Sequence, residues 1–228
     1  MSEVFSHKTL REQVAVILRK RILSGAIGPG EKIKEVEISK EFNISRGPVR
    51  EALRQIEQEG LIVYSANKGC TVKTLSPSSI SEVYLIRSTV EALAVRVYSG
   101  NMKQSTIEKL EMIVDDIGVA AEKNDLNSIV ENVEKFHATI VREAGLDKLF
   151  NIWKSFAGVN AATYYTMQKA GLMPNKRLKL NHMNIVNAFK DGKTDNICEV
   201  IQKHYMVVPE DLFKQTKSKE ECKTENRA

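Results

Sequence analysis

Apolar residues recur at helical spacing along the first third of the chain, and glycine and polar residues interrupt the pattern at short intervals. The pattern predicts three helices, at 10–22, 35–42 and 46–59, followed by two short strands, at 61–64 and 70–73. Ser45 stands in the N-cap position of the third helix, and Gly60 ends that helix. Three helices and a hairpin are enough to form a small domain.

The polar run from Ser76 to Ser79 is the natural domain boundary, because Pro77 lacks the amide proton that a continuing strand would need. Beyond it the pattern is helical, with helices predicted at about 79–98, 105–122, 126–144, 147–167, 176–190 and 194–205. The last residues hold almost nothing to bury. We therefore expect a mostly α protein with a domain at 1–76, an all-α helical bundle at 77–215 and a disordered tail at 216–228.

Most of the net positive charge lies in the first predicted domain. Residues 1–76 hold 13 Lys and Arg against 9 Asp and Glu, so +4 of the net charge of +5 lies in one third of the chain. This asymmetry favours a polyanion as the partner of that domain. No apolar run is long enough to cross a membrane, and the first residues lack the layout of a signal peptide. We expect a cytoplasmic protein without a membrane partner.

The three cysteines, Cys70, Cys198 and Cys222, are far apart and form no Cys-x-x-Cys pair. This spacing argues against both a disulfide framework and a structural zinc knuckle.

Arg46, Arg50 and Arg54 recur every four residues in the third predicted helix, so their side chains share one face. A guanidinium group can bind both acceptors of a guanine in the major groove, or it can clamp a phosphate. An alternative is a solvated face whose arginines pair with nearby glutamates, namely Glu51, Glu57 and Glu59. Spacing alone does not decide between the two interpretations.

The order of motifs in residues 8–76 resembles the GntR family of bacterial regulators. The matching stretches are Pro29 to Glu31, Ile44 to Leu53 and Glu59 to Leu61. The resemblance implies a winged helix-turn-helix in which Ser45, Arg46 and Arg50 contact DNA while Asn67, Lys68 and Gly69 form the tip of the wing. Val36 and Ala66 replace the basic residue and the wing histidine of some members, so contacts from these two positions are not carried over.

The remainder of the chain resembles the all-helical FCD effector domain of FadR-type members, in which Arg87 and Glu91 match the opening pattern. Many such domains hold a metal with an aspartate and three histidines. His137, His182 and His204 fit this pattern in order, but Val133 occupies the aspartate position.

The residues themselves also favour a site, since each of the three histidines extends the apolar stripe of its helix and should point inward. Three converging imidazoles suit zinc, nickel or another divalent transition metal. Glu134, water or a carboxylate of the effector would then complete the coordination. The alternative is that each histidine is a core residue bonded to a neighbour.

Arg87 is a candidate for binding an acidic effector, although an ion pair with Glu91 is the alternative. Several aromatic residues are expected in the core and the pocket wall: Phe150, Trp153, Phe156, Tyr164 and Tyr165.

These observations predict a transcription regulator that is not an enzyme. It would bind a palindromic operator as a homodimer and respond to a small, acidic metabolite. Three rival functions are a metal-dependent hydrolase fused to a DNA-binding module, an architectural DNA-binding protein, and a regulator with a fatty-acyl effector and no metal. No sequence motif supplies the general base that the hydrolase needs.

Overall fold

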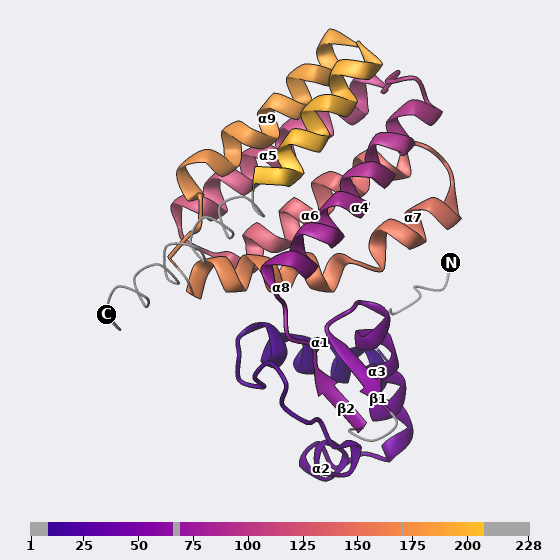
Figure 1. Cartoon of the computed structure of the whole chain (residues 1–228), viewed down its shortest axis with the longest axis vertical. Helices are drawn as coiled ribbons and strands as arrows, with labels where there is room; N and C mark the ends of the chain where they lie inside the picture. The colour runs from indigo at the N-terminus through magenta and orange to yellow at the C-terminus, as the bar shows by residue number, and fades with distance from the viewer. Residues whose placement is uncertain (1–8, 66–68, 170, 208–228) are drawn as a thin grey trace, which may run out of the picture. The chain divides into compact units, whose positions relative to one another are not determined.

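The computed structural model describes residues 9–65, 69–169 and 171–207 (Figure 1). The chain divides into two compact units, with the boundary between Leu75 and Ser76. Asn67, Lys68 and the tail at 216–228 lie outside the described residues, so the expectations for them stay predictions.

The first unit consists of three helices and a hairpin. They are α1 (Leu10–Leu23), α2 (Glu35–Glu41), α3 (Arg46–Gln58), β1 (Ile62–Ser65) and β2 (Gly69–Val72). Thr9 and Glu12 form a capping box that starts α1. Asn43, with φ of 53°, makes the left-handed turn between α2 and α3.

The hairpin is antiparallel, with Ile62 opposite Val72 and Ser65 opposite Gly69. Each strand is shifted by one residue from the predicted apolar runs, although the N–H of Lys73 still donates to the carbonyl of Leu61 at 2.9 Å just beyond the paired residues. An isolated bridge between Lys32 and Thr71 adds a further pairing at the outer edge of β2. The unit is therefore a winged helix-turn-helix, as predicted.

The core of the first unit lies between α1 and α3, which pack against each other. Leu18 from α1 and Val49, Leu53 and Ile56 from α3 are fully buried. Because these α3 residues share one side of the helix, its opposite side is directed to solvent.

The second unit is entirely helical in the part that the structure describes. Its helices are α4 (Pro77–Val97), α5 (Gln104–Glu122), α6 (Leu126–Arg142), α7 (Asp147–Lys154), α8 (Ala157–Lys169), α9 (Asn175–Asp191) and a C-terminal helix at 194–207. The predicted boundary segment proves to be the start of α4. Ser76 and Ser79 form a capping box, and Pro77 occupies the first turn, where its missing N–H is no loss.

The single helix predicted at 147–167 is wrong, because the chain forms two helices with a break at Ser155 and Phe156. The Ser155 hydroxyl donates to the carbonyl of Ile152 at 2.7 Å, a local bond that competes with helix continuation. The break lets α7 and α8 pack separately on α4 and α6. Apolar spacing could not reveal it, since residues on both sides of the break are buried.

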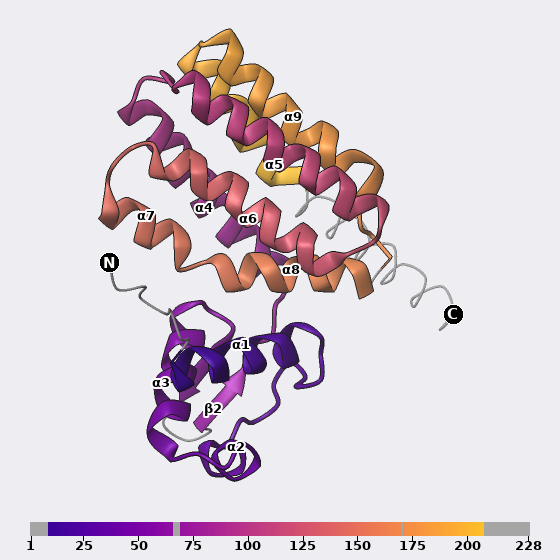
Figure 2. The ribbon, with the colours of Figure 1, turned by 180° about the vertical axis from the view of Figure 1, so that it is seen from behind.

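Within this unit, α5 runs beside both α6 and α9, as the two opposite views show (Figures 1 and 2), and α4 packs against α6, α7 and α8. The contact of α5 with α9 is close at Gly118, where a β-carbon would approach Lys179 Cδ to 2.8 Å. Across the described residues, none of the helices is both long enough and apolar enough to cross a membrane.

Candidate DNA-binding and metal sites

The arginines of α3 lie on its solvent side. The side chains of Arg46, Arg50 and Arg54 are 57%, 49% and 63% exposed, while Val49 and Leu53 on the other side are fully buried. The helix is thus fixed to its own domain by one face and presents positive charge with the other.

Glu35 of α2 contacts two of these arginines. Its Oε2 lies 3.3 Å from Arg46 Nη2 and 3.4 Å from Arg50 Nε, and its side chain is only 17% exposed. The sequence analysis did not find this residue, because it precedes Arg46 by 11 positions and meets α3 only through the helix-turn-helix fold.

The glutamates named from the sequence behave differently from one another. Glu51 pairs with Arg54 at 3.1 Å. Glu59 instead binds Arg19, and Glu57 accepts from the backbone N–H of Tyr64 at 3.0 Å. Of the three glutamates predicted as partners, Glu51 alone pairs with an arginine of α3, so the solvated-face interpretation holds in its predicted form for Arg54.

Ser45 has the extended backbone of an N-cap, but its hydroxyl makes no capping hydrogen bond. The hydroxyl and the first amides of α3 are therefore available to an anion. At the wing, Gly69 has φ of 72°, a left-handed conformation that favours glycine where the turn enters β2.

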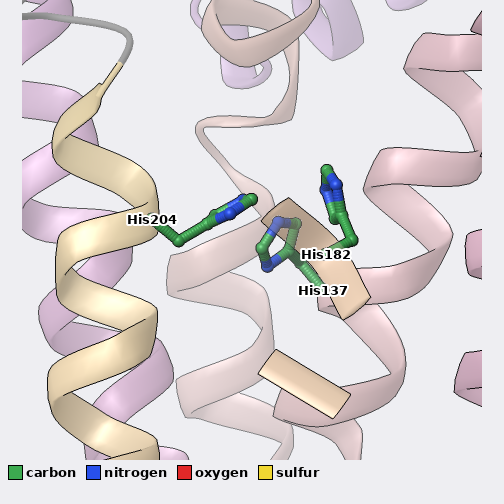
Figure 3. A group of neighbouring side chains, drawn as sticks. All are labelled: His137, His182 and His204. Carbon is green, nitrogen blue, oxygen red and sulfur yellow. The ribbon is translucent and has the colours of Figure 1, made fainter. Parts of the chain in front are cut away.

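The structure brings three histidines together in the second unit. His137 lies on α6, His182 on α9 and His204 on the C-terminal helix, and one ligating nitrogen from each lies within 4.8 Å of the others. Figure 3 shows the three rings gathered around one small space. The first two are buried and His204 is partly buried.

Hydrogen bonds orient two of the rings. His137 Nδ1 lies 2.8 Å from Glu91 Oε1, and His182 Nδ1 lies 2.8 Å from the carbonyl of Leu178. A carboxylate or a carbonyl oxygen only accepts, so Nδ1 carries a proton in both rings and Nε2 is the nitrogen left for a ligand.

Two of the inward nitrogens, His182 Nε2 and His204 Nδ1, are buried without any hydrogen-bond partner. Burial, and then the proximity of His137, lower the pKa of His182 to about 3. Burial and the neighbouring histidines also hold the pKa of His204 well below its usual value. Both rings are therefore neutral at physiological pH and offer lone pairs rather than charges.

This donor set fits a divalent transition metal. Neutral imidazoles are ordinary ligands of zinc, and three protein ligands leave one position open. Nitrogens about 2.1 Å from a tetrahedral zinc lie roughly 3.4 Å apart, so the three rings would have to close slightly. The adjoining cavity of about 30 Å³ has room for an ion or a water molecule. Its lining comprises Tyr84, Val133, His137, Asn160, Tyr164, Pro174, Leu178, Asn181, His182, His204, Tyr205 and Val207.

Glu134 does not join the histidine group. Its Oε2 accepts from Arg87 Nη2 at 2.9 Å and lies 3.4 Å from Asn160 Nδ2. Val133, at the position expected for an aspartate, is buried and lines the cavity.

Arg87 is fully buried, and its guanidinium lies 3.9 Å from the ring centre of Trp153. It pairs with Glu134 rather than with Glu91, so the i, i+4 ion pair considered from the sequence does not form. The reason is that both side chains turn inward from α4, where α6 supplies each with a partner. Arg87 Nε and Nη1 and Glu134 Oε1 remain buried without a partner, which is costly unless something binds them.

The aromatic residues are distributed between core and pocket wall. Trp153 and Phe150 are buried beside Val141 and Ala94, and Tyr164 is buried in the cavity wall. Phe156 and Tyr165 are only partly buried.

Comparisons with known proteins agree with the division of the chain into two units. Residues 10–72 match the family model of bacterial regulatory proteins of the gntR family, and residues 82–206 match that of the FCD domain. The chain is 25% identical to the HTH-type transcriptional repressor RspR of Escherichia coli K12 over 204 residues, 89% of each protein. It is 31% identical to the uncharacterized HTH-type transcriptional regulator YdhC of Bacillus subtilis, over 54% of this chain and 56% of YdhC. The solved structure of E. coli McbR/YncC superposes with a TM-score of 0.74 at 19% identity, covering 92% of this chain and 100% of that one, and shows the same fold.

Proposed function

The chain belongs to the GntR family of bacterial transcriptional regulators and carries an FCD domain, and on this premise we propose that it is a dimeric, ligand-responsive regulator. It reads DNA with α3 and the wing, and it takes up a small carboxylate at the histidine site. The observation that carries the proposal is the convergence of three histidines inside a domain attached to an exposed arginine face.

The amino-terminal half of α3 is the reading surface. Arg46 and Arg50 enter the major groove, where they contact base edges, and the Ser45 hydroxyl binds a phosphate. Arg54, one turn further along the helix, contacts the phosphate backbone of the DNA. At the wing, Gly69 and its neighbours at 67 and 68 approach the adjacent groove or phosphates.

The operator is expected to be palindromic, because one small winged domain makes few base contacts and two copies multiply the discrimination. Light scattering at micromolar concentration should give the mass of a dimer, both for the free protein and for its complex with DNA. A monomer in both samples would contradict the dimeric arrangement, and footprinting of the bound DNA would show whether two half-sites are protected.

Glu35→Gln should raise affinity for DNA of any sequence by a few fold. The carboxylate holds Arg46 and Arg50 in the free protein, and exposed ion pairs of this kind contribute about 0.2–1 kcal/mol each. Glutamine keeps the size of the side chain but removes the charge that competes with DNA. The specificity ratio between operator and scrambled duplex should fall, since the arginines lose the group that orients them.

Glu37→Gln is the matched control, because Glu37 lies on the same helix and pairs with Lys34 instead. Both variants would be measured by fluorescence anisotropy on operator and scrambled duplexes at two salt concentrations. If Glu35→Gln and Glu37→Gln behave alike, Glu35 has no role in DNA reading.

Metal would be held by His137, His182 and His204. When bound, it supplies a Lewis-acid position that accepts an anionic oxygen of the effector. Because Val133 is no carboxylate ligand, the direct ligands of the metal would all be imidazole rings, and the open position would carry more of the positive charge of the cation than in a site with a coordinating carboxylate. An anionic effector is therefore favoured.

Arg87 supports the same choice of effector. Two of its nitrogens, Nε and Nη1, are buried without a partner, and a carboxylate is the group that matches a guanidinium edge. A fatty-acyl effector is disfavoured by the lining of the cavity, which includes histidine, tyrosine and asparagine side chains. A hydrolase is disfavoured because the carboxylates of Glu91 and Glu134, which would have to act as the general base, are already engaged by hydrogen bonds.

Effector binding would draw together the three helices that carry the histidines and so favour one of two arrangements of the dimer. A thermal-shift screen of small carboxylates, with and without zinc, tests this step. Hits that need zinc support the proposed site, whereas hits that are indifferent to zinc place the effector elsewhere.

A further inference from the structure

Glu91 is a fully buried carboxylate without a permanent counter-ion. In the described chain its hydrogen-bond partners are His137, at 2.8 and 3.1 Å, and the hydroxyl of Tyr205, at 2.8 Å. No lysine or arginine among the described residues forms an ion pair with it, since the neighbouring Arg87 is paired with Glu134. A buried carboxylate in such surroundings requires a positive charge nearby.

The direction of the hydrogen bond between Tyr205 and Glu91 is set by Trp153. An indole nitrogen can only donate, and Trp153 Nε1 lies 3.3 Å from the Tyr205 hydroxyl oxygen. The Tyr205 proton is then free to go to Glu91, so this carboxylate accepts from both neighbours. An ionised Glu91 can only accept, so His137 carries a proton on Nδ1 and Nε2 is the nitrogen left to ligate the metal.

We propose that Glu91 is the positioning carboxylate of the histidine site and supplies the negative charge that Val133 does not. This inference rests on the proposed metal site. A carboxylate bonded to the far nitrogen of a ligating histidine fixes its tautomer and makes it a stronger ligand. Glu91 contributes this charge from α4, through His137, without contacting the metal itself.

A competing explanation uses the same contacts. If His137 were an imidazolium, it would itself be the counter-ion of Glu91, and no metal would be needed. The two explanations differ in the effect of Glu91 on zinc affinity, so they can be separated by experiment.

The experiment compares zinc binding by the full-length wild type and Glu91→Gln, both without a histidine tag. Isothermal titration and the emission of Trp153, the single tryptophan of the chain, give two readouts that need no DNA. We expect zinc affinity to fall by about 10- to 100-fold in Glu91→Gln, with the circular dichroism of the metal-free protein unchanged. Tyr205→Phe, which removes only the second bond to Glu91, should lower zinc affinity by a smaller but measurable factor, between about three- and tenfold.

Each outcome has a distinct meaning. If the wild type binds zinc and Glu91→Gln binds it within twofold, the role of Glu91 is wrong while the proposed metal site stands. If Glu134→Gln loses zinc and Glu91→Gln does not, the supporting carboxylate is Glu134. If the wild type binds no zinc, both the site and this inference fail, and Glu91 is the ion-pair partner of His137. Should Glu91→Gln not fold, Tyr205→Phe decides: wild-type zinc affinity in that variant overturns the inference.

Discussion

Replacing Arg46 or Arg50 by alanine is expected to weaken operator binding by about 1–3 kcal/mol each, which is the usual contribution of a bidentate arginine contact to a base. Both side chains leave the first two turns of α3, where a recognition helix contacts base edges. The loss should be large on the operator and small on a scrambled duplex, because base contacts carry sequence information and phosphate contacts do not.

Arg11→Ala is a suitable control for this experiment, since Arg11 is an exposed arginine of the same domain on α1, outside the predicted reading surface. Affinities would be measured by anisotropy over a range of salt concentrations, with circular dichroism to verify the fold. If both α3 variants keep the operator affinity of the wild type, the protein reads DNA with another surface.

The exposed arginine face proposed as the reading surface was largely predictable because it depends on local periodicity. Arg46, Arg50 and Arg54 share a face at four-residue spacing, whatever the rest of the fold does. Glu35 was not predictable in the same way, since its contact with α3 depends on how α2 and α3 cross. Long-range electrostatic partners of this kind are set by tertiary packing, to which sequence spacing gives no access.

At the histidine site, too, the local pattern was predictable and the tertiary partners were not. The stripes around His137, His182 and His204 predicted that each ring faces inward, and the structure brings the rings together. The partners that orient them, Glu91 and the carbonyl of Leu178, could not be assigned from spacing. The sequence offered an i, i+4 pair on one helix, but buried charges bond across helices, where desolvated partners are available.

The double variant His182→Ala, His204→Ala is expected to abolish stoichiometric metal binding. Wild-type protein purified without a tag should contain about one zinc or nickel per chain. It should also gain thermal stability when metal is added, because a ligand that binds only the folded state stabilises it by about 2.7 kcal/mol at 100 times its dissociation constant. For a domain of this size that corresponds to a rise in Tm of roughly 5–10 °C.

The comparison is made between metal-free and metal-loaded samples of each protein, so the packing lost in the alanine variant cancels from the shift. His204→Gln adds a milder variant that keeps a polar side chain at the partly buried position. Because His182 and His204 are neutral and one nitrogen of each has no partner, their removal should cost the metal-free protein mainly the cavity they leave and the hydrogen bond from His182 to the carbonyl of Leu178. A wild type that holds no stoichiometric metal, gains nothing from zinc or nickel and melts as the double variant does would make these histidines core residues and leave the effector to bind without a metal.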